Sequence, residues 1–125
     1  NLYSKRDWGH ARDYVQAMWL MLQQKKADDY VIASGNQFTV KKFINITASI
    51  LKIKIRWKGK GINEKAYDEK GNCIIKIDKK YFRPNEVNSL MGNSSKARKE
   101  LNWKPKFNIK SLIKDMINYE FFNDK

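Results

Sequence analysis

The stretch "YVIASGNQFTVKKFINITASILKIKIRW", Tyr30–Trp57, decides the fold class because its hydrophobic periodicity changes twice. Its apolar residues are consecutive over residues 30–34, lie three and four apart after Thr39, and alternate over residues 53–57. These periods predict a buried strand, a helix that Thr39 caps and that ends near Leu51, and a half-buried strand. Strands that alternate with helices indicate an α/β fold.

Further helices are predicted on both sides of this stretch. The run "HARDYVQAMWLMLQQ" predicts a helix over about Gly9–Lys25 with Asp7 as its N-cap. Its apolar face is predicted to consist of Ala11, Tyr14, Val15, Met18, Met21 and Leu22. The run "SKARKEL" predicts a short helix that stops at Asn102, a residue type that tolerates a left-handed conformation. Asn108 then caps a last helix, whose apolar face carries Ile109, Leu112, Ile113, Met116 and Ile117.

A polar, glycine-containing loop is predicted over Lys58–Asn72, and the run "CIIKID", Cys73–Asp78, predicts a further buried strand. Cys73 is the single cysteine, so it forms no internal disulfide, and we interpret it as a small core residue. The predicted order is helix, strand, helix, strand, strand, helix, helix, which is a mixed α/β fold.

The composition limits the partners. The formal charge is +13 over 125 residues, but 21 lysines stand against 5 arginines, together with 13 isoleucines and 12 asparagines. The lysines are spread along the whole chain. Proteins that recognise nucleic-acid phosphates or bases favour arginine. We therefore interpret the charge as a compositional drift and expect no nucleic-acid role. No apolar run approaches the ~20 residues of a membrane span, so we expect a cytoplasmic protein without a membrane partner.

Several catalytic patterns are missing from the sequence. One histidine and one cysteine cannot form a transition-metal cage, and there is no G-x-G-x-x-G, P-loop or Tyr-x-x-x-Lys pattern. His10 is interpreted as a helix-start or packing residue. The aromatic residues Trp8, Trp57, Tyr81 and Trp103 are interpreted as core. We accordingly assign no catalytic, cofactor-binding or metal-binding residue to this chain.

The run "KKYFRPNEV", Lys79–Val87, places charged groups after a strand. The proline after Arg83 favours an extended conformation for this arginine, and Glu86 can accept two hydrogen bonds from vicinal sugar hydroxyls. With Arg6, which precedes a helix, these residues suit a nucleotide clamp: arginine for a diphosphate and a carboxylate for a ribose. An internal Arg83–Glu86 ion pair, or a capping network of Arg6 and Asp7, is the alternative.

The stretches "NLYSKRDWGHARDYVQAMWLMLQ", "DDYVIASG", "KKYFRPNEV" and "LMGNSSKARKELNWKPKF", with the final helix, resemble GDP-mannose 4,6-dehydratases. These are extended short-chain dehydrogenases/reductases. The resemblance covers residues 1–125 and implies the C-terminal, nucleotide-sugar-binding portion of such an enzyme. An N-terminal Rossmann domain, absent from this chain, would bind NADP and carry the catalytic residues.

The resemblance also implies roles for particular residues. Arg6 and Arg83 match arginines that reach the diphosphate, Glu86 matches the ribose-binding acid, and Lys5 and Asn1 line the same pocket. The implied enzyme is a carbon–oxygen lyase that converts GDP-mannose to GDP-4-keto-6-deoxymannose and water. Its implied partners are GDP-mannose, the Rossmann half and further copies of itself. The alternatives are a non-catalytic nucleotide- or polyanion-binding module and a related nucleotide-sugar epimerase or reductase.

Overall fold

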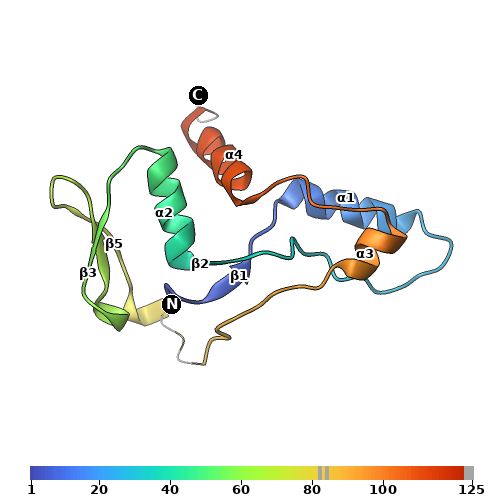
Figure 1. Ribbon diagram of the computed structural model, residues 1–125, viewed down its shortest axis with the longest axis horizontal. Helices are drawn as coiled ribbons and strands as arrows, with labels where there is room; N and C mark the ends of the chain where they lie inside the picture. Colours follow the sequence, from blue (N-terminus) through green and yellow to red (C-terminus); the bar gives the residue numbers. More distant parts are fainter. Residues whose placement is uncertain (82, 84, 123–125) are drawn as a thin grey trace. The chain divides into compact units, whose positions relative to one another are not determined.

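The computed structural model describes residues 1–81, 83 and 85–122, which form two compact units (Figure 1). The sheet unit comprises Asn1–Ser4 and Thr39–Asn88. The helical unit comprises Lys5–Phe38 and Ser89–Lys125. Each unit contains helices and short strands, as the predicted α/β class requires.

The sheet unit combines one helix with a three-stranded antiparallel sheet. The helix is α2 (Val40–Ile50), and the strands, in spatial order, are β3 (Arg56–Lys58), β4 (Lys65–Tyr67) and β5 (Cys73–Lys76). Ala66 of the central strand lies opposite Trp57 on one side and Ile75 on the other, and it is fully buried. The sheet therefore packs around a small central residue.

The helix α2 forms where the sequence predicts it. The Thr39 side chain accepts a hydrogen bond of 3.0 Å from the backbone N–H of Lys42, which caps the first turn. The helix ends at Ile50, and Lys52 then adopts a positive φ of 58° that turns the chain away. Both ends of α2 are thus set by local interactions.

The predicted polar loop contains regular structure that the sequence reading missed. Residues 58–72 hold a 3-10 turn, η1 (Gly61–Asn63), and the strand β4. The strand predicted over residues 53–57 begins only at Arg56. The start of β3 is set by its pairing with β4, because the hydrogen bonds of a sheet form only where two strands run side by side.

The strand predicted over Cys73–Asp78 is confirmed as β5 (Cys73–Lys76), but the prediction that this strand is buried is wrong. This strand lies at the edge of the sheet, and Cys73 and Ile74 are exposed. The interpretation of Cys73 as a core residue is wrong for the same reason. A strand at the edge of a sheet has a neighbouring strand on one side only, so its apolar residues are less buried. The hydrophobic periodicity of the sequence does not show which strand lies at the edge. Beyond β5 the chain forms a second 3-10 turn, η2 (Lys79–Tyr81).

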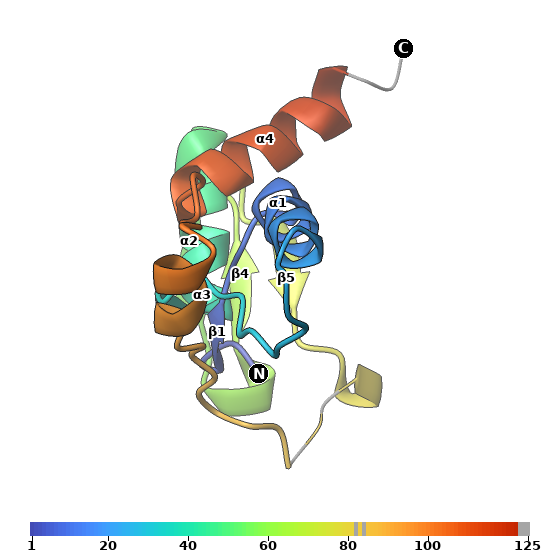
Figure 2. The same cartoon turned by 90° about the vertical axis from the view of Figure 1, so that its right-hand side faces the viewer.

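The described residues of the helical unit form three α-helices and a two-stranded sheet (Figures 1 and 2). The helices are α1 (Ala11–Leu22), α3 (Ser95–Glu100) and α4 (Ile109–Phe122). The strands are β1 (Lys5–Asp7) and β2 (Gln37–Thr39). The core consists of Ala17, Ala97, Leu101 and Trp103.

The beginning of α1 differs from the prediction. His10, not Asp7, is the N-cap, and its Nδ1 accepts a hydrogen bond of 3.1 Å from the N–H of Arg12. The Asp7 carboxylate instead accepts hydrogen bonds from the backbone N–H groups of Ser34 and Gly35, both at 2.8 Å. Asp7 therefore joins two chain segments that are far apart in sequence, which no local rule could predict.

The buried face of α1 agrees only in part with the predicted apolar face. Tyr14 and Met21 pack against the core as predicted, whereas Val15, Met18 and Leu22 are exposed. Asp13 and Ala17 are the buried residues of this helix. Asp13 is buried because its backbone oxygen accepts a hydrogen bond from the Trp103 indole, and its carboxylate accepts the N–H groups of Lys106 and Phe107. The loop before α4 thus packs on the face of α1 that carries Asp13, and this contact determines which face is buried.

The strand predicted over residues 30–34 does not form in the part of the chain that the structure describes. The segment is irregular, and its Ile32 side chain packs against the core of the helical unit. Ser34, at the end of this segment, directs its N–H to the Asp7 side chain. A strand forms only where its backbone hydrogen-bonds to the backbone of a neighbouring strand. Here the Asp7 carboxylate accepts the N–H of Ser34 instead.

The last two predicted helices are confirmed at their ends. Asn102, behind α3, has a positive φ of 49°. The Asn108 side chain accepts hydrogen bonds from the N–H groups of Lys110 and Ser111, both at 3.0 Å, and caps α4. Ile113 of α4 is buried, whereas Met116 is exposed. None of the helices in the described residues is long and apolar enough to cross a membrane.

Candidate functional site

The predicted clamp residues are divided between the two units. Asn1, Arg83 and Glu86 lie in the sheet unit, and Lys5 and Arg6 lie in the helical unit. The surroundings of these residues therefore belong to each unit separately.

Within the sheet unit, Glu86 and Asn1 lie together. The half-buried Glu86 carboxylate accepts a hydrogen bond of 3.4 Å from the Ser4 hydroxyl, and its Oε2 lies 4.0 Å from the backbone nitrogen of Asn1. Arg83 is exposed, and its carbonyl oxygen accepts a bond of 3.4 Å from the N–H of Glu86. Pro84, on which the predicted orientation of Arg83 depends, lies outside the described residues.

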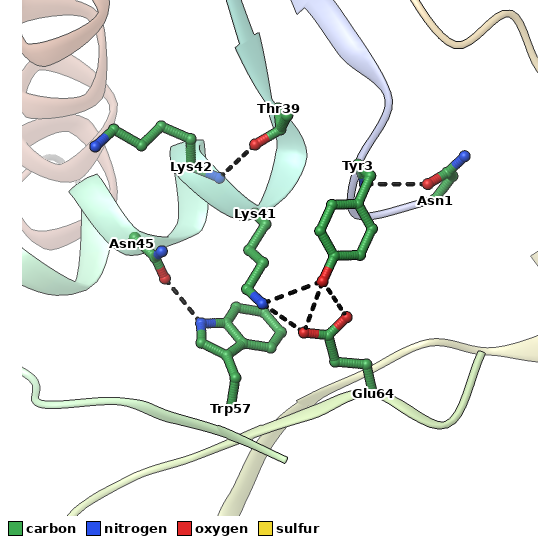
Figure 3. A network of polar contacts seen from close by, with 8 residues as sticks. All are labelled: Asn1, Tyr3, Thr39, Lys41, Lys42, Asn45, Trp57 and Glu64. Atoms are coloured by element: carbon green, nitrogen blue, oxygen red, sulfur yellow. Dashed lines mark hydrogen bonds and ion pairs between the residues drawn. The ribbon is translucent and has the colours of Figure 1, made fainter. Parts of the chain in front are cut away.

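A polar cluster next to this half of the clamp was not predicted (Figure 3). The Tyr3 hydroxyl donates to the Glu64 carboxylate, with oxygen–oxygen distances of 3.0 and 3.2 Å, and the Lys41 ammonium group forms an ion pair with the same carboxylate. The Lys41 nitrogen also lies 4.8 Å from the centre of the Trp57 ring. We call Tyr3, Lys41, Trp57 and Glu64 the Glu64 cluster.

The charges of the Glu64 cluster stabilise each other. The Glu64 side chain is 4% exposed, and burial alone would raise its pKa. The hydrogen bond from Lys41 outweighs this effect, and with the Tyr3 hydroxyl it holds the pKa of Glu64 below its ordinary value. The bond to Glu64 correspondingly raises the pKa of Lys41. The sequence offers little signal for this cluster, because its members come from four separate segments: residues 1–4, α2, β3 and the end of η1.

The backbone of segment 1–4 is bound to α2 as well. The N–H of Lys41 donates to the carbonyl oxygen of Leu2 at 2.8 Å, and the N–H of Val40 donates to that of Ser4 at 3.3 Å. Since these donors belong to the first turn of α2, they have no partner within the helix. Segment 1–4 is therefore held on both sides of Tyr3.

Within the helical unit, Lys5 and Arg6 lie on β1. Lys5 pairs in parallel with Ser89, and its carbonyl oxygen accepts the N–H of Leu90 at 3.2 Å. Arg6 is half-exposed, and its Nη1 donates to the carbonyl oxygen of Lys5 at 2.9 Å. The strand that carries both cations is thus hydrogen-bonded to the segment at residues 89–90.

The other polar residues of "KRDWGH" have structural partners. The Trp8 indole donates to the carbonyl oxygen of Phe38 at 3.0 Å. The His10 ring stacks on Phe107 at 3.8 Å between centroids, and its Nε2 lies 3.0 Å from the Asp115 carboxylate. The interpretation of His10 as a helix-start and packing residue is confirmed. The motif therefore anchors β1 to the rest of the helical unit.

The aromatic residues interpreted as core differ in burial. Trp103 is 2% exposed, which confirms the interpretation for this residue. Trp8 and Trp57 are half-buried, and Tyr81 is 72% exposed, so Tyr81 is not a core residue. The exposed Tyr81 belongs to η2, which immediately precedes the segment that carries Arg83 and Glu86.

The turn at Gly9, between β1 and α1, is closely packed. A side chain at Gly9 would meet the Tyr14 hydroxyl at 2.0 Å, so Tyr14 occupies the space beside this glycine. Burial, followed by the nearby carboxylates of Asp7 and Asp13, raises the pKa of Tyr14. His10 already caps the helix. The turn at Gly9 therefore supports the packing of Tyr14 against the start of α1.

A solved structure identifies the fold. The structure of RMD from Pseudomonas aeruginosa, complexed with NADPH, superposes with a TM-score of 0.69 at 18% sequence identity. The match covers 94% of this chain and 33% of that chain. The chain therefore has the same fold as about a third of that protein.

Sequence relatives define the family. The chain is 49% identical over 118 residues to the GDP-mannose 4,6 dehydratase of Dictyostelium discoideum, and 44% identical over 119 residues to that of Homo sapiens. A family model described as GDP-mannose 4,6 dehydratase matches residues 1–116. The chain belongs to the GDP-mannose 4,6 dehydratase family, which confirms the resemblance.

The matches also define the extent of the chain. Each of these two relatives is matched over 94% of this chain, but only over 33% and 32% of its own length. The chain thus spans about a third of the curated relatives that it matches, and it corresponds to a C-terminal part of them.

Proposed function

We propose that this chain is the nucleotide-sugar-binding part of an NADP-dependent GDP-mannose 4,6-dehydratase, which converts GDP-mannose to GDP-4-keto-6-deoxymannose and water. Family membership over residues 1–116 is the observation that carries the proposal. The two halves of the clamp support it, because each unit provides cationic or carboxylate side chains on an anchored segment.

Each clamp residue has a chemical role in this proposal. The planar guanidinium groups of Arg6 and Arg83 bind the diphosphate, which they can contact with two parallel hydrogen bonds. Lys5 adds positive charge beside Arg6. The Glu86 carboxylate accepts hydrogen bonds from the ribose hydroxyls. Asn1, whose side-chain oxygen accepts the N–H of Tyr3 at 3.0 Å, contributes to the substrate site next to Glu86.

The cofactor belongs to another part of the protein in this proposal. NADP would supply hydride transfer, and this sequence contains no glycine-rich dinucleotide motif that would hold it. We therefore assign NADP and the catalytic residues to the N-terminal Rossmann domain. The complete enzyme is proposed to be cytoplasmic and homo-oligomeric. The alternatives, a polyanion-binding module or a related epimerase or reductase, receive no support from the family match.

The test is the affinity of the complete enzyme for GDP. Arg83→Ala removes a charge-assisted contact worth roughly 1.5–3 kcal/mol, so GDP binding should weaken about 10- to 150-fold in calorimetric titration. Arg83→Lys should restore only part of the affinity, because lysine lacks the planar fork. Arg6→Ala should weaken GDP binding comparably. NADP affinity should not change in any of these variants.

Two exposed arginines provide matched controls. Arg56 lies in the sheet unit and Arg12 in the helical unit, so Arg56→Ala and Arg12→Ala remove the same charge without touching the proposed clamp. Both control variants should bind GDP as the unaltered enzyme does. Unchanged GDP affinity with a lower melting temperature in Arg83→Ala would favour the internal ion pair with Glu86 and reject the clamp.

A further inference from the structure

The hydroxyl of Ser4 is buried beside the carboxylate of Glu86. Ser4 is 1% exposed, and its Oγ lies 3.4 Å from Oε2 of Glu86, a residue 82 positions away in the sequence. We propose that Ser4 is a positioning residue, which orients the Glu86 carboxylate toward the ribose hydroxyls of the bound nucleotide. This inference rests on the proposed function, because it requires Glu86 to be the ribose-binding acid.

The backbone of Ser4 is fixed, so its hydroxyl can serve as a stationary donor. The Ser4 carbonyl oxygen accepts the N–H of Val40, at the start of α2. The preceding residue, Tyr3, is held by the buried Glu64 carboxylate and lies under the Lys41 ammonium group, 5.4 Å from the ring centre (Figure 3). Movement of Ser4 away from Glu86 would disrupt these contacts.

A fixed donor at Ser4 restrains the side chain of Glu86. Its carboxylate is 32% exposed, and the chi-3 torsion of a glutamate has a broad energy profile, so its rotation needs restraint. A carboxylate has two oxygens and about four lone-pair positions. A hydrogen bond from Ser4 to Oε2 is therefore compatible with acceptance of two ribose hydroxyls. The restraint lowers the conformational entropy that nucleotide binding would otherwise cost.

The experiment compares GDP with 2′,3′-dideoxy-GDP, which lacks both ribose hydroxyls, in titrations of the complete enzyme. Ser4→Ala should reduce the preference for GDP over the dideoxy analogue by roughly 2- to 10-fold, since one hydrogen bond is lost. The affinity for 2′,3′-dideoxy-GDP should stay unchanged. A purely structural role of Ser4 would weaken both nucleotides equally, and that result would overturn the inference.

Two further variants separate the inference from the proposed function. Ser49 is an exposed serine on α2 in the same unit, so Ser49→Ala should leave both affinities unchanged. Glu86→Ala should abolish the preference for GDP. If the preference survives in Glu86→Ala, the proposed site itself is wrong. If it is lost in Glu86→Ala but intact in Ser4→Ala, only the role of Ser4 is wrong.

Discussion

Glu64 shows how a single residue depends on partners from distant segments. Its carboxylate is nearly buried, and it lies among the Tyr3 hydroxyl, the Lys41 ammonium group and the Trp57 ring. A buried carboxylate without such partners would be costly. Since Lys41 and Tyr3 hold the pKa of Glu64 below its ordinary value, the folded state favours the charged form.

This shift predicts a pH dependence of stability. The contribution of Glu64 is complete above its unfolded pKa of about 4.5 and is lost as the pH falls through the lower folded value. Glu64→Gln should lower the free energy of unfolding by about 1–3 kcal/mol at pH 7. The difference between the two proteins should shrink below pH 4.5. Urea unfolding of the chain from pH 7 to pH 3 measures this.

The control is Glu69→Gln, because Glu69 is 58% exposed and pairs with the exposed Lys54 at 3.1 Å. Its free energy of unfolding should stay within about 0.5 kcal/mol of the unaltered chain at pH 7. Parallel curves for Glu64→Gln and the unaltered chain at all pH values would show that Glu64 gains nothing from Lys41.

At the scale of elements, two glycines with similar backbones shape the small sheet. Gly59 follows β3 with a φ of +87°, and Gly71 precedes β5 with a φ of +85°. A side chain at Gly59 would meet the carbonyl oxygen of Asn63 at 2.5 Å, whereas a side chain at Gly71 would meet nothing within 4 Å. The first turn is therefore restricted by both conformation and space, and the second by conformation alone.

This pair predicts two different costs for the same substitution. Gly71→Ala should destabilise the chain by about 1–2 kcal/mol, which is the conformational cost of a left-handed residue with a side chain. Gly59→Ala should cost about 1–3 kcal/mol more, because the turn must shift to remove the overlap. Thermal unfolding of both variants provides the measurement. Equal melting temperatures would mean that the turn at Gly59 relaxes freely.

At the scale of the whole molecule, the chain spans about a third of its curated relatives and consists of two units. The described residues form an antiparallel three-stranded sheet and a two-stranded sheet. The sequence contains no glycine-rich dinucleotide motif. In the proposed division of roles, NADP is therefore assigned to an N-terminal Rossmann domain and not to this chain.

We therefore predict that the isolated chain has no dehydratase activity. Incubated with GDP-mannose and NADP, it should yield no 4-keto sugar, because hydride transfer requires a bound cofactor. The complete enzyme under the same conditions is the positive control. Formation of keto-sugar by the isolated chain alone would contradict the division of roles proposed for the protein.

Several features were predicted correctly from interactions between residues that are close in the sequence. Thr39 and Asn108 cap helices that begin where predicted, and Asn102 adopts the expected left-handed conformation, because each depends on neighbours within a few residues. The family was also recognisable from the sequence, since motifs such as "KRDWGH" are contiguous. The roles of Arg6, Arg83 and Glu86 remain predictions that follow from this recognition and from their chemistry.

Tertiary structure decided what depends on residues far apart in the chain. The position of β5 at a sheet edge exposes Cys73, and the bond from Ser34 to Asp7 takes the carboxylate away from α1. The contact of Ser4 with Glu86 likewise appears only when residues 82 positions apart meet. Hydrophobic periodicity shows that a helix or strand has an apolar face. Which residues pack on that face depends on contacts between distant parts of the folded chain.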